Sequence, residues 1–316
     1  MPLKGVFLPL GYSCNNNCIH CFLPFADNPT NKTTEDAKKR IKQAAEYGID
    51  RISLTGGEPT IRKDIFELIS FCRDLNIEII QLQTNGRMLS YKPFCRKLFA
   101  SGLNEVCISF HGHTAQIQDR ITRVNGSFEQ TLKGIKNLFD VIKGTLPKEA
   151  LFPNIVVSSH NCRHLPDIIR FFSGLGFPLI EIEYPRLMGN AWRFKNDIPS
   201  RKEAALYMKS AAEVARQIGT ELFIDDFPVC LSDGFYDFNA YTRHGNDQIE
   251  LDLSSTEMRD TEKTDKLHSD KCNSCHAKGF CPGEWPENAK NFGWDSFRAL
   301  SSIDVNNINR SSGAKA

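Results

Sequence analysis

The sequence lacks long apolar runs and any marked excess of charge. None of its 316 residues lies in a stretch that approaches the roughly 18 apolar residues of a membrane-spanning helix. Lys and Arg total 39 against 38 Asp and Glu, so a net charge of +1 offers no field to recruit nucleic acid or an anionic membrane. The start of the chain is a poor signal peptide. We therefore expect a cytoplasmic protein with no nucleic-acid or membrane partner.

Cysteine, by contrast, is abundant. The chain has 11 cysteines, and an odd number without a secretion signal favours metal ligation in a reducing cytosol over a disulfide framework. Cys14, Cys18 and Cys21 form a CxxxCxxC motif directly after a short apolar segment. Three thiolates on one loop can ligate three irons of a [4Fe-4S] cluster and leave one iron open to a substrate or cofactor. A zinc site is the alternative, with His20 as the nearest further ligand.

Two more segments accompany this motif at the ends of predicted strands. They are Gly56-Gly57-Glu58-Pro59 and Thr84-Asn85-Gly86. Together the three segments resemble the radical S-adenosylmethionine (AdoMet) superfamily from about residue 5 to about residue 190. The resemblance implies that the open iron chelates the amino and carboxylate groups of AdoMet. It also implies that one electron cleaves AdoMet to a 5′-deoxyadenosyl radical, which requires an electron donor such as flavodoxin or ferredoxin.

Apolar segments alternate with amphipathic helical patterns over the first two thirds of the chain. The predicted strands are residues 5–10, 51–54, 77–83, 105–110, 154–158 and 179–184. Six strand-helix units predict an α/β fold with parallel pairing, and the resemblance implies a partial (β/α)6 TIM-like barrel over residues 1–220. Its active site would lie at the carboxyl ends of the strands. Residues 221–300 are predicted to form a small auxiliary Fe-S domain, in which 221–225 is a further candidate strand, and residues 301–316 a disordered tail.

The resemblance also assigns AdoMet contacts. Gly56 and Gly57 let a ligand approach the backbone, and Glu58 would lie near the AdoMet amino group. Polar residues at other strand ends would contact ribose or methionine, with strand-end caps as the alternative reading; these are Asn85, Ser109 and Ser158. A basic residue before the next helix, Arg120 or Arg123, would bind the AdoMet carboxylate, and Arg123 is the candidate retained.

Further candidates follow the fourth and sixth predicted strands. His111 and His113 are considered as proton donors or substrate contacts because histidine changes charge near neutral pH. Tyr184 and Arg186 occupy the equivalent place after strand six. The candidates retained for catalysis are His113, Tyr184 and Arg186, and surface-loop positions without a chemical role are the alternative.

A second cysteine group lies near the end of the chain. Cys272, Cys275 and Cys281 form a CxxCx5C motif, and Cys230 precedes them by 42 positions (272 − 230). This group resembles the SPASM or twitch appendage of radical AdoMet enzymes, which implies one auxiliary [4Fe-4S] cluster with four thiolate ligands. A four-cysteine zinc ribbon is the alternative. The other four cysteines are predicted to be buried small hydrophobes; they are Cys72, Cys95, Cys107 and Cys162.

These features predict a radical AdoMet enzyme that abstracts a substrate hydrogen, with oxidation, dehydrogenation or bond formation as the outcome. Two substrate classes remain open. One is a ribosomally made peptide, although we expect no room before Cys14 for a fused leader-binding domain. The other is a carbohydrate-like or tetrapyrrole-like small molecule. A non-catalytic Fe-S or zinc redox sensor is the remote alternative.

Overall fold

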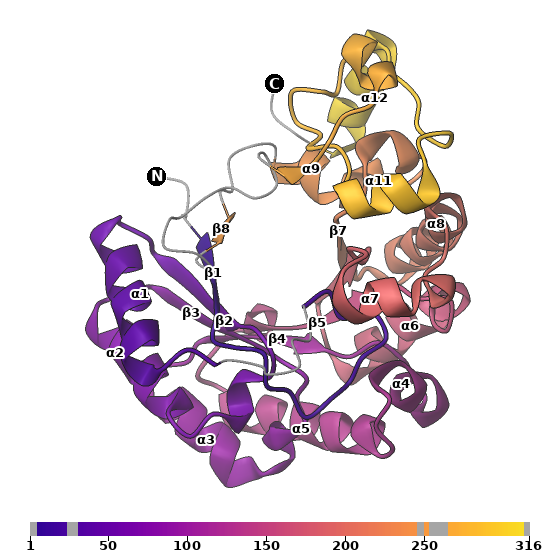
Figure 1. Ribbon diagram of the computed structural model, residues 1–316. Helices are drawn as coiled ribbons and strands as arrows, with labels where there is room; N and C mark the ends of the chain where they lie inside the picture. The colour runs from indigo at the N-terminus through magenta and orange to yellow at the C-terminus, as the bar shows by residue number, and fades with distance from the viewer. Residues whose placement is uncertain (1–4, 24–30, 245–249, 253–264, 313–316) are drawn as a thin grey trace.

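A single curved sheet organises the protein (Figure 1). The computed structural model describes residues 5–23, 31–244, 250–252 and 265–312. Its parallel strands follow the order β7-β6-β5-β4-β3-β2-β1-β8. The bounds are β1 Gly5–Pro9, β2 Arg51–Thr55, β3 Ile79–Thr84, β4 Glu105–Ser109, β5 Leu151–Val156, β6 Leu179–Glu183, β7 Glu221–Asp225 and β8 Glu250–Asp252. This topology confirms the predicted partial barrel.

Helices cover the outer face of the sheet, and a C-terminal group of helices lies beyond β7 (Figure 1). The bounds are α1 Thr34–Glu46, α2 Ile65–Asp74, α3 Lys92–Ala100, α4 Ala115–Thr122, α5 Ser127–Ile142, α6 Leu165–Leu175, α7 Gly189–Arg193, α8 Arg201–Ile218, α9 Ala240–His244, α11 Pro286–Phe292 and α12 Ser302–Ser312. In the described part of the chain, no helix is long and apolar enough to cross a membrane.

Side-chain alternation separates an apolar outer face of the sheet from a polar inner one. In β2, Ile52 and Leu54 join the large apolar core, whereas Ser53 between them points the other way. The Ser53 hydroxyl donates to the Gln81 side chain of β3 at 2.6 Å, and Gln81 in turn donates to Glu105 of β4. Because strands covered on both faces are usually apolar throughout, this polar layer indicates that the barrel interior is built for a ligand.

The structure corrects two predicted boundaries. Strand β7 pairs in parallel with β6, and β8 pairs with β1, so residues 221–225 and 250–252 belong to the barrel sheet. The predicted disordered tail contains helix α12, whose Ile308 is buried in a small apolar cluster of the C-terminal domain. Ser301 and Asp304 exchange hydrogen bonds at its start, the pattern of a helix cap. Residues 313–316 of that tail lie outside the described part.

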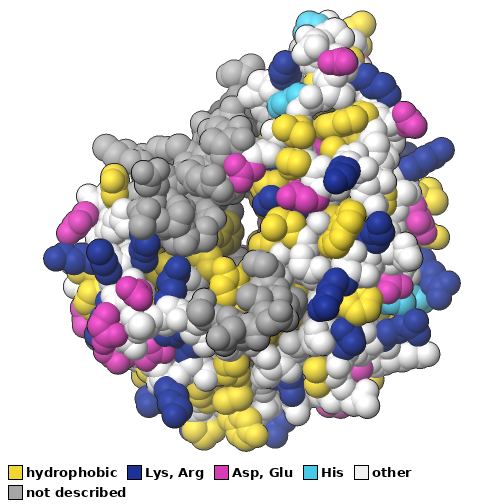
Figure 2. Space-filling model, viewed as in Figure 1, with side chains coloured by type: hydrophobic (Ala, Val, Ile, Leu, Met, Phe, Trp, Pro, Cys, Tyr) yellow, Lys and Arg dark blue, Asp and Glu magenta, His cyan; other side chains and the backbone are white. Residues whose placement is uncertain are grey.

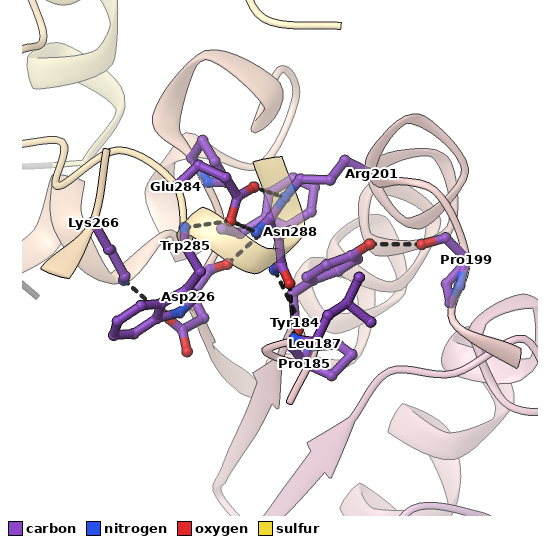
Figure 3. Close-up of polar contacts among 12 residues, drawn as sticks. Tyr184, Pro185, Leu187, Pro199, Arg201, Asp226, Lys266, Glu284, Trp285 and Asn288 are labelled. Atoms are coloured by element: carbon purple, nitrogen blue, oxygen red, sulfur yellow. Dashed lines mark hydrogen bonds and ion pairs between the residues drawn. The ribbon is translucent and has the colours of Figure 1, made fainter. Parts of the chain in front are cut away.

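Buried polar contacts fix the C-terminal domain on the barrel (Figure 3). Glu284 forms an ion pair with Arg201 at the start of α8, and both side chains are only 2% exposed. The Asn288 side chain accepts a hydrogen bond from the Leu187 backbone N–H at 2.8 Å and donates to the Pro185 carbonyl at 3.1 Å. The contact of Glu284 with Arg201 and the two contacts of Asn288 all reach the end of β6 or the start of α8. They therefore fix the orientation of the C-terminal domain on the barrel.

We expect Arg201→Met to lower the free energy of unfolding by about 3–5 kcal/mol, because it leaves the Glu284 carboxylate buried without a counter-charge. Urea unfolding measures this change. The matched control is Arg216→Met, which breaks an ion pair with Asp237 whose side chains are 41% and 27% exposed, and it should cost less than about 1 kcal/mol. Equal effects of the two substitutions would contradict the importance of the buried pair.

Candidate active site

Two backbone segments pack directly against each other at the start of the three-cysteine loop. The Gly57 N–H donates to the Gly11 carbonyl at 2.7 Å, and the Glu58 N–H donates to the Ser13 carbonyl at 2.8 Å. A Cβ atom on Gly56 would lie 2.6 Å from the Gly11 oxygen, and one on Gly57 would lie 2.1 Å from the Ser13 oxygen. Glycine is therefore required here for backbone approach. The approaching partner in this structure is the cysteine loop itself.

Helices α4 and α7 hold the rest of this loop. The backbone N–H of Asn17 donates to the Thr122 carbonyl at the end of α4, at 3.0 Å. From α7, the Ala191 N–H donates to the Cys21 carbonyl at 3.1 Å, and the Asn190 amide donates to the Cys18 carbonyl at 3.0 Å. The loop thus has fixed partners on three sides, which places its three cysteines together at the carboxyl ends of the strands.

The thiols of this loop are protonated when no metal is bound. Desolvation, and next the nearby Glu58 carboxylate, raise the pKa of the Cys14 thiol to about 11. Burial also raises the pKa of Cys21, and it raises that of Cys18 well above its ordinary value. The thiols are therefore neutral at pH 7, and metal ligation would have to displace their protons. Such a donor set suits thiophilic metals such as iron in a cluster or zinc.

Glu58 and Asn85 adjoin Cys14. The Glu58 carboxylate accepts hydrogen bonds from the Thr60 N–H at 3.0 Å, the Thr84 hydroxyl at 2.7 Å and the Asn85 N–H at 2.7 Å. Burial raises its pKa, although these bonds act in the opposite direction. The Asn85 amide nitrogen lies 4.0 Å from the Cys14 sulfur. The structure therefore brings these two predicted site residues to the cysteine loop.

Two buried histidines lie beside Cys18. The rings of His20 and His111 are 4.3 Å apart, and the ligand atoms of these two residues and Cys18 lie within 4.8 Å of one another. Burial lowers the pKa of His20 to about 3 and that of His111 well below its ordinary value, so both rings are neutral at pH 7. The Val156 N–H donates to Nδ1 of His111 at 3.1 Å, which leaves the proton on Nε2. The sequence analysis considered His20 as a further metal ligand and His111 as a proton donor or substrate contact, but it did not predict that the two rings lie together.

Two of the three predicted catalytic residues belong to the domain interface. Tyr184 is fully buried, and its hydroxyl donates to the Pro199 carbonyl at 2.6 Å (Figure 3). Arg186 forms an ion pair with Glu287 at 3.1 Å and lies over the Trp285 ring at 4.0 Å. These contacts give both residues a structural role, and their assignment to catalysis stays a prediction.

His113, the third candidate, belongs to a different group of possible ligands from His20 and His111. It is half-buried, with its ring 5.7 Å from that of His164, and the two form a group with Asp167 whose ligand atoms lie within 4.8 Å. Burial lowers the pKa of His113. His164 in turn accepts a hydrogen bond from the Arg163 side chain at 3.3 Å. In the described part of the chain, no hydrogen bond or ion pair links His113 to the three cysteines.

The remaining predicted AdoMet contacts have other partners in the structure. The Ser158 hydroxyl and N–H both donate to the Asn161 side chain, at 3.2 and 2.7 Å, as in a turn. Arg123 ends α4 in a left-handed conformation with its guanidinium 4.8 Å from the Phe194 ring. Ser109 is half-buried at the last position of β4, beside Asn154 of β5 in the sheet register. Among the described residues, the Ser109 hydroxyl forms no hydrogen bond, so Ser109 stays a candidate AdoMet contact.

Acidic side chains line the inner face of the last barrel strands. Glu181 and Glu183 alternate along β6 with the core residues Ile180 and Ile182, and Asp225 ends β7. Burial, and next the charge of Asp225, raise the pKa of Glu181 to about 7. Burial likewise raises the pKa of Glu183 and of Asp225. This acidic inner wall can therefore hold or release a proton near neutral pH, and sequence reasoning missed it.

The second cysteine group converges in the C-terminal domain. One small cavity is lined by Pro228, Cys230, His268, Cys272, Cys275, Ala277, Lys278, Cys281, Gly283, Trp294, Phe297 and Arg298. Burial raises the pKa of Cys230 to about 11, and the thiols of the other three cysteines act in the same direction. Cys230 thus lines the same cavity as Cys272, Cys275 and Cys281, and its role as a metal ligand stays a prediction. The other four cysteines of the chain are buried, also as predicted.

Comparisons with known proteins agree with this geometry. Residues 8–157 match the sequence model of the Radical SAM superfamily. A probable GTP 3′,8-cyclase of Methanocaldococcus jannaschii is 30% identical over 184 residues, which are 58% of this chain and 59% of that protein. One of Sulfurisphaera tokodaii is 32% identical over 63% of this chain and 62% of that protein. The chain therefore matches about six tenths of the length of these relatives.

Solved structures share the fold over nearly the whole chain. Streptococcus suis SuiB bound to S-adenosylmethionine has a TM-score of 0.66 and 16% identity, over 96% of this chain and 77% of that one. The structure of native anSMEcpe with bound AdoMet has a TM-score of 0.64 and 15% identity, over 99% and 97% of the two chains. With its three-cysteine loop, the stretch from residue 8 to residue 157 therefore matches a Radical SAM domain, and the solved structures share the fold of the chain.

Proposed function

We propose that this radical SAM enzyme carries a first cluster on Cys14, Cys18 and Cys21 and an auxiliary cluster on the second cysteine group, and that it oxidises or cross-links a peptide. The observation that carries this proposal is the convergence of Cys230 with Cys272, Cys275 and Cys281 on one cavity. A barrel with AdoMet chemistry alone has no need for a second set of four thiols.

The first cysteine loop fits a cluster with one open iron, since three thiols and no fourth cysteine lie on it. When bound, that cluster would supply the electron that cleaves AdoMet. The chain's own part is to orient the cofactor. Glu58 has a buried carboxylate beside Cys14, and Asn85 has an amide there, so these two side chains would hold the methionine end of AdoMet.

The second group fits a cluster better than zinc. Four sulfurs at about 2.3 Å from one zinc ion would lie about 3.8 Å from one another. Among the described residues, the groups whose ligand atoms all lie within 4.8 Å include no three of these cysteines. A larger group with one thiolate per iron suits that spacing. Four protein ligands would leave no open iron, so the auxiliary cluster would serve electron transfer and not substrate binding.

A peptide is the substrate class that we propose. The fold of this chain matches 99% of its length to anSMEcpe, which has been solved with AdoMet and the Cp18Cys peptide, at a TM-score of 0.65. SuiB has likewise been solved with its precursor peptide SuiA. The acidic inner wall supports this choice, because Glu181 and Glu183 can accept hydrogen bonds from peptide N–H or ammonium groups.

A small-molecule substrate is the second candidate. It is favoured by the relatives named GTP 3′,8-cyclase, whose similarity covers only part of either chain. The experiment that separates the two is mass spectrometry after incubation of the reconstituted enzyme with AdoMet, a reductant and either candidate peptides encoded near the gene or GTP. A peptide with altered mass supports the proposal. Conversion of GTP with no peptide change would overturn the substrate class.

We predict about eight irons per chain after anaerobic reconstitution, because two cubane clusters follow from the two cysteine groups. Metal analysis measures iron and zinc together. Replacing Cys14, Cys18 and Cys21 by Ala should remove about four irons and abolish AdoMet cleavage, while the auxiliary cluster remains. Four irons with one zinc in the parent protein would reject the auxiliary cluster.

Glu58→Gln should weaken AdoMet binding about 10- to 100-fold, the equivalent of about 1.5–3 kcal/mol for a hydrogen bond to a charged group. Isothermal titration of the reconstituted protein measures this affinity. The control is Thr84→Val, which removes a donor to the same carboxylate but keeps its charge, and it should change the affinity less. Equal losses in both variants would assign Glu58 a structural role only.

Cys230→Ala tests the ligand that is most distant in sequence. If Cys230 completes the auxiliary cluster, the variant should lose that cluster or show a changed EPR signal on addition of an external thiol. The first cluster should still cleave AdoMet to 5′-deoxyadenosine. Cys162→Ala, which removes a buried cysteine outside both groups, serves as the control. An unaltered auxiliary signal with full iron content in Cys230→Ala would show that Cys230 is no ligand.

A further inference from the structure

A patch of cations and aromatic rings lies on the outside of the three-cysteine loop. It consists of Arg120, Arg123, Arg193 and Lys195 together with Phe22 and Trp192, and we call it the basic face. Phe22 is 47% and Trp192 44% exposed, although large aromatic side chains are usually buried. Figure 2 shows Lys and Arg side chains gathered with apolar ones over the region where Figure 1 places α4 and α7.

Cation-aromatic contacts join the members of the basic face. Arg123 of α4 lies over the Phe194 ring at 4.8 Å, and Lys195 lies over the Trp192 ring at 4.4 Å. The contact of Arg123 with Phe194 therefore connects the end of α4 to the end of α7, the two helices that hold the cysteine loop. Arg193, between these aromatic residues, is exposed.

The cations of the basic face have no paired carboxylate among the residues that the structure describes. In the described part of the chain, its four cations form no ion pair with a carboxylate. Nε2 of His160 accepts a hydrogen bond from Arg120, and burial lowers the pKa of His160, so this ring is neutral at pH 7 and leaves the charge of Asp197, 3.4 Å away, in place. Four cations without an ion-paired carboxylate in the described part of the chain thus lie on this face, although the net charge of the chain is only +1.

The basic face adjoins the first cysteine group through sequence neighbours and backbone hydrogen bonds. Phe22 directly follows Cys21, and Ala191, next to Trp192, donates its N–H to the Cys21 carbonyl. On the other side, the Ile19 N–H donates to the Ile121 carbonyl, next to Arg120, at 3.0 Å. A protein bound to this face would therefore be separated from Cys18 and Cys21 by only one layer of residues.

We propose that the basic face docks an acidic one-electron carrier protein that reduces the first cluster. This inference rests on the proposed function, which consumes one electron for each AdoMet cleaved. The carrier would lose one electron and the docked protein would gain it, while no bond forms or breaks. Charge complementarity with a small apolar centre is the usual character of such short-lived electron-transfer contacts.

The test compares two double charge reversals. One is Arg193→Glu with Lys195→Glu on the basic face, which leaves Arg123 and its predicted AdoMet contact unchanged. The control is Arg96→Glu with Lys133→Glu, two exposed cations of α3 and α5 that form no ion pair in the described part of the chain. Both variants lower the net charge equally. Iron content and thermal unfolding confirm that each variant is folded and loaded.

The measurement is the rate of first-cluster reduction, followed by the EPR signal that responds to AdoMet. The reductant is either reduced flavodoxin of net negative charge or dithionite. With flavodoxin at low ionic strength, the basic-face variant should be at least about tenfold slower than the parent, and the parent rate should fall as salt is added. Dithionite should reduce all three proteins at similar rates, and the control should match the parent with both reductants.

Equal flavodoxin rates in the two variants would overturn the proposal. Unchanged flavodoxin rates together with weaker binding of a peptide substrate to the basic-face variant would likewise overturn it, and would assign the face to the substrate. A parent protein that reconstitutes without an AdoMet-responsive cluster would overturn the proposed function as well. The dithionite arm therefore distinguishes a failed docking surface from a failed enzyme assignment.

Discussion

Backbone contact between the cysteine loop and the Gly56-Gly57 turn is the constraint on which the site depends. Three thiols can share one metal group only if a loop without regular structure is held in one conformation, at a considerable cost in conformational entropy. Backbone hydrogen bonds between the loop and Gly57, Glu58, Thr122 and Ala191 offset this entropy loss. Side chains on either glycine would collide with the loop's carbonyl oxygens. The turn after β2 therefore belongs to the loop's scaffold as much as to any cofactor site.

A second constraint acts between the barrel and the C-terminal domain. The Arg201–Glu284 pair is nearly inaccessible to water, so its formation must repay the desolvation of two charges. Lys266 similarly pairs with Asp226, which also accepts a hydrogen bond from the Trp285 ring at 3.0 Å (Figure 3). Apolar packing tolerates small rotations, whereas these directional contacts do not. The interface is consequently suited to hold the second cysteine group at one distance from the barrel interior.

Much of this architecture can be predicted from the sequence, because strands in a covered parallel sheet read as short apolar runs. The apolar residues of β4 are one example. The motifs that follow β1, β2 and β3 helped in a different way, because they mark where these strands end. Strand β7 was harder to predict from the sequence, because Glu221 and Asp225 make both of its ends polar. Strand β8 was harder to predict because it has only three residues. Tyr184 appeared catalytic because a polar group after a strand resembles a ligand contact. Its partner carbonyl at Pro199 and the cover from Arg201 are visible only after folding.

The end of strand β6 connects the two halves of the proposed chemistry. Glu181 and Glu183 of this strand face the barrel interior, while Pro185 and Leu187 just beyond it bind Asn288 of the C-terminal domain. Asn288 lies seven positions after Cys281 (288 − 281), on the segment that also carries Glu284. Any movement of the second cysteine group relative to the barrel would therefore strain the strand that presents the acidic inner wall. A rigid β6 end would hold the barrel interior and the second cysteine group at a fixed distance from each other. The proposed electron transfer between substrate and auxiliary cluster would require such a fixed distance.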